Sequence, residues 1–329
     1  KEYGGEGRSH VEMAIFNEEA GYFHVPMVGY ALTVNVVGNS IITFGTEEQK
    51  REYLPRIARG EILFCQGFSE PGSGSDLASL QTQAVEDGDE YVINGQKIYT
   101  SNAHIADYIF LLARTDPNVP KHKGLSLFVV PMDAPGVSIR PLYTLGGVRL
   151  NQTFLENVRV PRKNLIGEKN RGWYHATTAL DFERSGAGRV GYGRRILEML
   201  VQYTKETRRN GQPLSKDPVI RQKLAQMEIE LEVARLIAYR VASMQSRGLI
   251  PNHEASMSKL YGTEYLKRLA NVGMEILGPY SSLQTGSKWV PLRGKIEALA
   301  RTSLGGTIAA GTSEIQRYII AGRGLGLPR

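Results

Sequence analysis

The sequence contains very little of the chemistry that builds disulfides and metal centres. It has one cysteine and six histidines in 329 residues. A single cysteine excludes an internal disulfide and fits a reducing compartment. We expect Cys65 to be a small buried side chain rather than a nucleophile, because no histidine is near enough in the sequence to suggest an activating pair. The histidines are scattered without the spacing of a helical metal site, so no metal ion is expected.

Long hydrophobic runs are also missing. The longest apolar segments, around residues 109–112 and 125–130, have the length of strands, whereas a membrane helix needs about 18 apolar residues. Hydrophobic residues make up 41% of the chain and charged residues 22%, as in an ordinary globular protein. We therefore expect no membrane span. The chain begins at Lys1 without an initiator methionine, and we expect further residues before it.

Acidic residues are fewer than basic residues. Lysine and arginine number 40 against 33 acidic residues, which gives a formal net charge of +7. This excess favours an anionic partner such as a phosphorylated cofactor, a CoA ester or a nucleic acid. The basic residues are spread along the chain, with only short clusters such as Arg194-Arg195 and Arg208-Arg209. Evidence for nucleic-acid binding is therefore weak.

Residues 9–60 are predicted to form helices. Thr46 and Gln49 have the spacing of a capping box, in which each side chain hydrogen-bonds the other residue's backbone N–H. The helix that starts there is expected to run to about Ala58, and Gly60 ends it. We assign residues 1–61 to a helical domain.

Residues 62–168 change to short apolar segments separated by turn residues. Asp87-Gly88-Asp89 and Asn94-Gly95 flank the segment 90–93, and Asn-Gly is a strong hairpin signal. Further strands are expected at 97–101, 108–113, 125–131, 137–142 and 153–160. No helical pattern interrupts them, so we predict an antiparallel β domain of about seven strands, either a barrel or a sandwich.

Residues 169–329 return to helical spacing and are predicted to form a bundle. Ile196 and Leu200 share one helix face, as do Met227 and Leu231 on another helix. Additional helices are expected over 253–277, 290–301 and 313–321. The fold class is therefore α+β: helices, then a β domain, then a helical bundle.

A loop rich in small polar residues lies at the start of the β domain. The stretch 65–80 reads CQGFSEPGSGSDLASL and includes Gly72, Gly74 and Asp76. Glycine allows close backbone approach, while serine and aspartate offer hydrogen bonds. The loop fits either contact between a polar ligand and the main chain or a plain surface turn, and the residues alone leave both open.

The bundle contains a Gly-x-Gly-x-x-Gly pattern at 186–191, with Glu206 about twenty residues later. A dinucleotide site of this kind needs a strand before the helix and a second parallel strand after it. Residues 207–219 do not supply that second strand. We therefore favour the other explanation, that the glycines allow close helix packing.

A charged segment precedes that pattern. Asp181 and Arg184 share a helix face if the helix has begun, and Glu183 projects elsewhere. The segment is either a solvated turn or a carboxylate held against Phe182, whose pKa would then rise and suit it to proton abstraction. The residues alone leave both interpretations open.

Several segments together resemble the acyl-CoA dehydrogenase family over essentially the whole chain. They are KEYGG (1–5), CQGFSEPGSGSDL (65–77), YVINGQKIYTSNA (91–103), NVRVPRKNLIGEKNRGW (157–173), LDFERSG (180–186) and AAGTSEIQRYIIAGRGLGLPR (309–329). The resemblance implies N-terminal helices, a β domain and a C-terminal four-helix bundle. It also implies that the family's first few helices lie before Lys1.

The same resemblance implies a function in lipid catabolism by β-oxidation. Members use FAD to convert an acyl-CoA substrate to the trans-2-enoyl-CoA: a carboxylate takes the α proton, N5 of the flavin takes the β hydride, and the electrons pass to an electron-transfer flavoprotein. The enzyme is expected in the cytoplasm, or in the mitochondrial matrix of a eukaryote. Alternatives within the fold are a flavin oxidase or monooxygenase, a non-catalytic partner subunit and a nucleic-acid-binding relative.

The resemblance assigns roles to individual residues of this chain. The positions that match the flavin site are Gln66, Phe68, Ser69, Tyr99 and Ser101, with Arg208, Thr312 and Glu314 assigned to the rest of the cofactor. Tyr99 stands where many members have tryptophan. Ser75 matches a contact to CoA, and Asp181 and Arg184 match residues around the pantetheine and the mouth of the site.

Two departures from the family pattern are informative. Many members carry the base as a glutamate before the C-terminal Gly-Thr, where this chain has Ala310. A subset similar to the isovaleryl and long-chain enzymes places the base in an L-x-x-E-R pattern instead, which makes Glu183 the expected base. This position of the base favours branched, long or bulky acyl groups.

The second departure concerns the far half of the FAD site. An arginine that reaches the pyrophosphate of FAD in the neighbouring subunit is replaced by Thr207, and a common glutamine is Glu275. An added carboxylate near a pyrophosphate is unfavourable without a compensating contact. We expect a weakened contribution across the dimer. The chain would then form either a homo-oligomer (dimer or tetramer) or a hetero-oligomer with a second dehydrogenase subunit, as in the steroid side-chain enzymes that it partly resembles.

Overall fold

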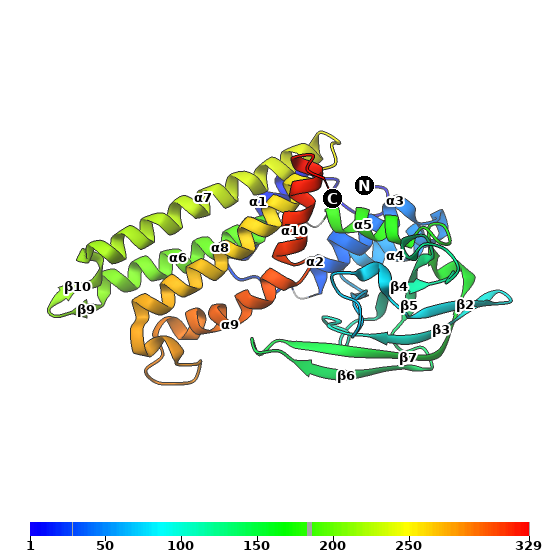
Figure 1. The fold of residues 1–329 in the computed structure, drawn as a ribbon, viewed down its shortest axis with the longest axis horizontal. Helices are drawn as coiled ribbons and strands as arrows, with labels where there is room; N and C mark the ends of the chain where they lie inside the picture. Colours follow the sequence, from blue (N-terminus) through cyan, green and yellow to red (C-terminus); the bar gives the residue numbers. More distant parts are fainter. Residues whose placement is uncertain (28, 183–185, 329) are drawn as a thin grey trace. The chain divides into compact units, whose positions relative to one another are not determined.

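The computed structural model describes residues 1–27, 29–182 and 186–328 (Figure 1). The chain forms two compact units. The first unit contains residues 1–7 and 27–183, and the second contains residues 8–26 and 184–329. The N-terminal residues that the sequence suggests as one helical domain are thus divided between the two units.

The sheet of the first unit is mixed rather than purely antiparallel. Its strands follow the order β6 (Val137–Tyr143), β7 (Arg149–Pro161), β3 (Glu90–Lys97), β2 (Gln83–Asp87), β4 (Tyr108–Arg114), β5 (Leu125–Pro131) and β8 (Leu165–Ile166). Strand β1 (Phe64–Gly67) pairs in parallel with β4, and β2 meets β4 through one parallel pair. The expected antiparallel pairing is wrong at these two places, because β1 reaches β4 only after the chain has passed through β2 and β3. Within the described residues the strand path stays open and forms no closed barrel.

The Asn94-Gly95 pair does not form the predicted hairpin turn. It lies inside β3, where the register with β7 shifts between Ile93 and Gly95. A side chain on Gly95 would lie only 2.7 Å from Cα of Thr82, so glycine here permits close approach of two backbones. The other turn signal is confirmed: the turn between β2 and β3 falls at Gly88, which has a positive φ of 63°. The predicted strand at 97–101 is also absent, because β3 ends at Lys97.

Short helices cover part of this sheet. They are α2 (Tyr30–Leu32), a π-helical turn (Thr33–Gly38), α3 (Asn39–Phe44), α4 (Glu47–Ala58) and α5 (Gly172–Phe182). The predicted capping box is confirmed at the start of α4, where the hydroxyl of Thr46 accepts from the N–H of Gln49. Gln49 also donates to the carbonyls of Lys163 and Leu165, which ties α4 to the β8 edge of the sheet.

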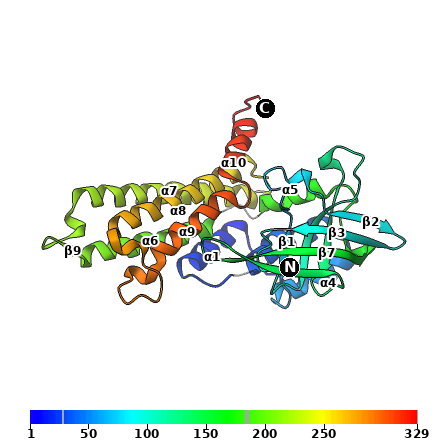
Figure 2. The same ribbon diagram turned by 60° about the horizontal axis from the view of Figure 1, so that its bottom comes forward.

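The second unit is a bundle of long helices (Figures 1 and 2). It contains α1 (His10–Tyr22), α6 (Ala187–Glu206), α7 (Pro218–Ser246), α8 (His253–Leu277), α9 (Lys295–Ile308) and α10 (Ser313–Ile319). The apolar positions predicted from the helical spacing are buried in its core, including Ile196, Leu200, Met227 and Leu231. The order of helices, β domain and helices agrees with the prediction.

The glycine pattern at 186–191 serves helix packing, as expected. A side chain on Gly191 would overlap with the backbone of Glu18, and one on Gly21 would overlap with the backbone of Gly188. The helices α1 and α6 therefore pack backbone to backbone. After α6 the chain forms a two-stranded antiparallel hairpin, β9 (Arg208–Arg209) and β10 (Gln212–Pro213), rather than the parallel strand that a dinucleotide fold requires.

Candidate functional site

The predicted flavin residues of the first unit lie on two adjoining segments, which we call the β1–β3 wall (residues 66–70 and 97–101). The first segment is the end of β1 and the residues after it; the second is the end of β3 and the turn that follows. The N–H of Ile98 donates to the carbonyl of Ser69 at 2.9 Å. This bond brings Phe68 and Ser69 next to Tyr99 and Ser101, although the two segments are about thirty residues apart in the sequence. The bond thus joins the two segments that carry the five positions predicted to line the flavin.

The side chains of this wall differ in exposure. Phe68 is buried in the core, and Ser69 is half-buried. The Tyr99 side chain is 60% exposed. Gln66 is half-buried, but its Nε2 atom is buried and has no hydrogen-bond partner within the described residues. A buried amide donor without a partner is costly, so this atom marks a position where a ligand acceptor would be favourable.

An ion pair that the sequence reasoning missed lies inside the wall. Nζ of Lys97 lies 2.8 Å from Oε1 of Glu70, and the two side chains are 0% and 7% exposed. Lys97 also donates to the carbonyl of Phe68 at 3.1 Å. Glu70 accepts two backbone N–H bonds, from Gln81 at 2.6 Å and Thr82 at 2.9 Å. The pair therefore joins both segments of the wall to the start of β2.

Burial shapes the protonation of this pair. Burial lowers the pKa of Lys97 to about 8, against the opposing effect of Glu70. Burial alone would raise the pKa of Glu70, but Lys97 and the donors around the carboxylate outweigh it and hold that pKa below its usual value. One feature of the sequence could have predicted this ion pair. Lys97 falls on the same alternate positions of β3 as Tyr91 and Ile93, whose side chains are buried. A charged residue at an inward strand position requires a buried partner.

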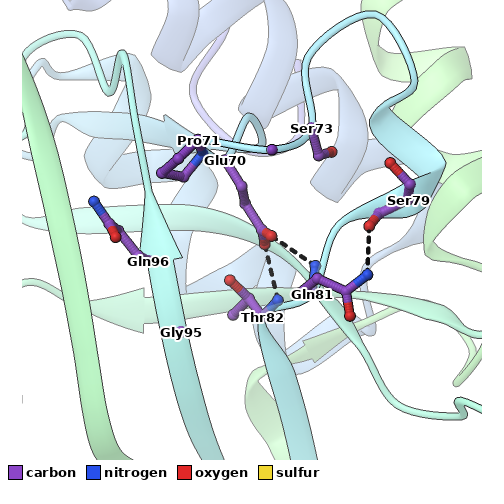
Figure 3. A pocket seen from close by; sticks show the side chains of 9 residues that line it. Glu70, Pro71, Ser73, Ser79, Gln81, Thr82, Gly95 and Gln96 are labelled. Carbon is purple, nitrogen blue, oxygen red and sulfur yellow. Dashed lines mark hydrogen bonds between the residues drawn. The ribbon is translucent and has the colours of Figure 1, made fainter.

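The small-residue loop after the wall forms one side of an open cleft of about 450 Å³ (Figure 3). The cleft is lined by Glu70, Pro71, Gly72, Ser73, Ser79, Gln81, Thr82, Gly95 and Gln96. In Figure 3 the carboxylate of Glu70 points toward the backbone of Gln81 and Thr82 rather than outward. At the tip of the loop Ser75 is exposed, and Asp76 is paired with Lys121 at 2.6 Å. The exposure of Ser75 leaves it accessible to a ligand, and its contact to CoA stays a prediction.

Of the residues predicted at and around the base, the structure describes only Asp181. Glu183 and Arg184 lie outside the described residues, and Asp181 lies in the last turn of the helix. The start of α5 packs so closely on β5 that a side chain on Gly172 would overlap with the backbone of Ser126. The His175 ring stacks on Phe44 with 4.2 Å between centroids, and burial lowers its pKa. The first two turns of α5 are therefore firmly attached to the first unit.

The predicted cofactor residues of the second unit are built differently. Arg208 is exposed on the β9–β10 hairpin, and its guanidinium donates to the carbonyl of Gly211 at 2.9 Å. Thr207 lies at the end of α6, where its N–H donates to Tyr203. Glu275 on α8 forms an ion pair with Lys223 on α7. The extra carboxylate thus has a cation beside it, which reduces its repulsion toward a phosphate.

The C-terminal site residues surround the start of α10. The hydroxyl of Thr312 caps this helix by accepting from the N–H of Ile315 at 3.2 Å, as the sequence predicts for a cap. Glu314 is exposed and lies 3.8 Å from Arg317. Ala310, which replaces the base of many relatives, has a positive φ of 53°. A methyl side chain has no acid–base function, so this position cannot supply the base.

Neither a metal-binding cluster nor a membrane-length apolar helix is found in the described parts of the chain. No cluster of three or more His, Cys, Asp or Glu side chains is arranged to hold a metal ion there. No helix of the same residues has the length and apolar character needed to cross a bilayer.

Comparison with known proteins assigns all three parts of the chain. Residues 1–61 match the N-terminal domain of acyl-CoA dehydrogenase, residues 65–158 its middle domain and residues 170–325 its C-terminal domain. Acyl-CoA dehydrogenase FadE26 of Mycobacterium tuberculosis is 42% identical over 340 aligned residues, covering 100% of this chain and 84% of the relative.

Solved structures of two-chain enzymes are also similar. The ChsE4-ChsE5 complex from Mycobacterium tuberculosis matches at 41% identity and a TM-score of 0.91, covering 100% of this chain and 85% of that one. A structure described as the Tcur3481-Tcur3483 steroid ACAD matches at 40% identity and a TM-score of 0.93, covering 100% and 84%. On this evidence the chain belongs to the acyl-CoA dehydrogenase family of FAD-dependent enzymes.

Proposed function

We propose that the chain dehydrogenates an acyl-CoA thioester to the trans-2-enoyl-CoA, with the isoalloxazine of FAD held against the β1–β3 wall. The observation that carries the proposal is the pairing of Ser69 with Ile98, which joins the two segments of predicted flavin contacts. FAD, when bound, supplies the acceptor for the β hydride. The protein's own task is to hold the thioester, remove the α proton and exclude water.

The residues of the wall fit a flavin. Gln66 offers a buried Nε2 donor that has no partner among the described residues, and the polar edge of a flavin carries acceptors. Tyr99 offers a largely exposed ring beside this donor's segment, where a planar aromatic group would cover it. Ser69 and Ser101 add hydroxyl groups near these positions.

Glu183 is the proposed base. It follows directly after α5, and Ala310 at the alternative position cannot accept a proton. In this role its carboxylate takes the α proton of the thioester, while hydrogen bonds to the thioester carbonyl stabilise the negative charge that develops there. Asp181 and Arg184 are proposed at the mouth of the site, and Ser75 is proposed to contact CoA.

The substrate is proposed to be a bulky acyl-CoA of the steroid side-chain class. This rests on the base position at Glu183 and on similarity to a protein described as a steroid enzyme. The net charge of +7 suits an anionic CoA ester. An electron-transfer flavoprotein is the proposed electron acceptor, and the cytoplasm the proposed location.

A hetero-oligomer with a second dehydrogenase subunit is the proposed assembly. Two of the similar structures are described by pairs of chains. Thr207 replaces the arginine that would bind the pyrophosphate of FAD, and the neighbouring Arg208 already donates to Gly211 within its own hairpin. This chain would therefore contribute less than its partner to the second half of a shared flavin site.

Anaerobic bleaching of bound FAD by a panel of acyl-CoA thioesters tests the proposed reaction. We expect bulky thioesters to bleach the wild-type flavin and Glu183→Gln to slow bleaching at least a hundredfold, since general-base catalysis is worth about 10²–10⁴-fold. Glu156→Gln, at an exposed position of β7, should bleach at the wild-type rate. Wild-type bleaching in Glu183→Gln would contradict the assignment of the base. Oxygen uptake during turnover would instead favour an oxidase.

A further inference from the structure

The turn that carries Tyr99 has a strained backbone. Tyr99 has a φ of 58° and Asn102 a φ of 62°. Left-handed backbone is uncommon outside glycine, and it is a genuine outlier for a bulky aromatic residue. Such strain persists only where the surroundings fix the backbone by several contacts. The contacts that fix this turn therefore determine where the exposed Tyr99 ring points.

One residue of β7 makes two of these contacts. Asn151 is fully buried, and its carbonyl accepts from the N–H of Thr100 at 2.9 Å. Its side-chain Nδ2 donates to the carbonyl of Thr100 at 2.9 Å. Both backbone polar groups of Thr100 are thus bound by a single residue. Thr100 is itself fully buried, while Tyr99 and Ser101 on either side of it are exposed.

The orientation of the Asn151 amide is fixed by its neighbours. Nε of Arg149 lies 3.2 Å from Oδ1 and can only donate, so Oδ1 is an acceptor. The carbonyl of Thr100 can only accept, so Nδ2 is a donor. The second proton of Nδ2 is directed at Nδ1 of His104, at 3.2 Å. The amide therefore uses its two donors and its acceptor at once, which makes it a rigid support.

We propose that Asn151 is a positioning residue, which sets Tyr99 and Ser101 for the flavin by holding Thr100 between them. The inference rests on the proposed flavin site and goes beyond it, because Asn151 belongs to neither segment of the β1–β3 wall. Its hydrogen bonds reach the flavin residues only through the backbone of Thr100. A purely structural asparagine would affect stability but leave the flavin unchanged.

Two substitutions in the full chain test this role. Asn151→Asp keeps the shape and places an acceptor against the carbonyl of Thr100, with Arg149 still beside the new carboxylate; Asn151→Ala removes the side-chain bonds without adding charge. Hydrogen exchange of residues 98–102, measured without added FAD, should be roughly fivefold to tenfold faster, as expected for loss of one hydrogen bond. In the FAD-loaded protein the flavin absorption spectrum should shift, and kcat should fall about tenfold to a hundredfold with little change in KM.

Asn157→Asp is the matched control on the same strand. Asn157 is exposed and accepts from Nδ2 of Asn94 through Oδ1, which a carboxylate retains. Exchange at residues 98–102, the flavin spectrum and kcat should all stay at wild-type values.

The outcomes separate this inference from the proposed flavin site. Unchanged hydrogen exchange at residues 98–102 in the Asn151 variants would overturn the inference. It would also be overturned if exchange became faster but the flavin spectrum stayed unchanged in these variants, although Tyr99→Leu shifts that spectrum. If Tyr99→Leu also leaves the spectrum unchanged, the flavin site itself is wrong. Loss of the native circular dichroism spectrum in both Asn151 variants would likewise overturn the inference, because a positioning residue leaves the fold intact.

Discussion

The β1–β3 wall of the first unit and the 207–213 hairpin of the second unit use their polar groups in opposite ways. In the wall, Lys97 and Glu70 are almost fully buried and bind backbone groups of two separate segments, at Phe68 and at Gln81 and Thr82. In the hairpin, Arg208 is exposed and, among the described residues, donates to Gly211 of its own turn. The family resemblance assigns FAD contacts to both. The comparison indicates that the wall is preorganised, whereas the cofactor contacts proposed for the hairpin depend on the proposed assembly.

Because the charges of the wall are buried and those of the hairpin are exposed, mutations in the two regions should affect the free energy of unfolding differently. A buried charge that loses its partner has no water to replace it, and the free energy of unfolding falls sharply. An exposed charge is solvated in any case, so its ion pairs contribute little. Mutations in the wall should therefore change stability, and mutations in the hairpin should change cofactor binding with little effect on stability.

The largest stability effect is expected from Lys97→Met. This change leaves Glu70 buried without its cation and should lower the free energy of unfolding by about 3–5 kcal/mol, measured by urea denaturation. Lys121→Met, which removes the exposed partner of Asp76, is the control and should cost no more than about 1 kcal/mol. Adding Glu70→Gln to Lys97→Met should recover part of the loss. Equal effects of the two lysine changes would contradict the comparison.

Restoring an arginine at position 207 should strengthen FAD binding. A charge-assisted hydrogen bond to phosphate contributes about 1.5–3 kcal/mol, so Thr207→Arg should lower the Kd for FAD by about tenfold or more. The measurement is FAD retained per subunit after gel filtration, followed by a titration. Asn210→Arg adds the same charge to an exposed position of the hairpin and should give little gain. A similar gain in both variants would indicate a general charge effect.

Removal of the Lys223–Glu275 ion pair should change stability only slightly. The Lys223 side chain is 39% exposed and that of Glu275 is 57% exposed, so Lys223→Ala should lower the free energy of unfolding by no more than about 1 kcal/mol. Lys223→Ala should bind FAD more weakly than the wild type, because the Glu275 carboxylate loses its cation. Lys216→Ala, at another lysine of the second unit, is the control for loss of one positive charge. Unchanged FAD binding in Lys223→Ala would place Glu275 away from the cofactor.

Elements with local signals were predictable from the sequence. The capping box of Thr46 and the apolar spacing of Met227 and Leu231 each involve contacts within a few residues or along one helix face, and the structure confirms them. The prediction of a turn at Asn94-Gly95 was wrong because this dipeptide forms a bulge in β3. The backbone of Thr82 lies so close that it leaves no room for a side chain at position 95. That neighbour is more than ten residues away, beyond the reach of a turn rule.

The candidate site was predictable only where its residues form a contiguous motif. Gln66, Phe68 and Ser69 lie in one such motif, and their contacts to the flavin stay predictions. Asn151 was missed, because an asparagine in a strand has no distinguishing pattern until the tertiary fold places it against Thr100. The parallel pairing of β1 with β4 was missed for the same reason, since it joins residues some forty positions apart.

The smallest change in the free energy of unfolding is expected on acidification. It tests the difference between the wall and the hairpin at one carboxylate, that of Glu70. Lys97 and the backbone donors keep the pKa of Glu70 below its unfolded value despite burial, so ionised Glu70 stabilises the fold above the unfolded pKa. This stabilisation is lost as the pH falls through the lower folded value. The free energy of unfolding of wild type should therefore decline more steeply on acidification below about pH 4.5 than that of Glu70→Gln. Urea titrations at several pH values measure the difference. Parallel curves would mean that Glu70 gains no net stabilisation from its buried partners, and the wall would then be no better preorganised than the hairpin.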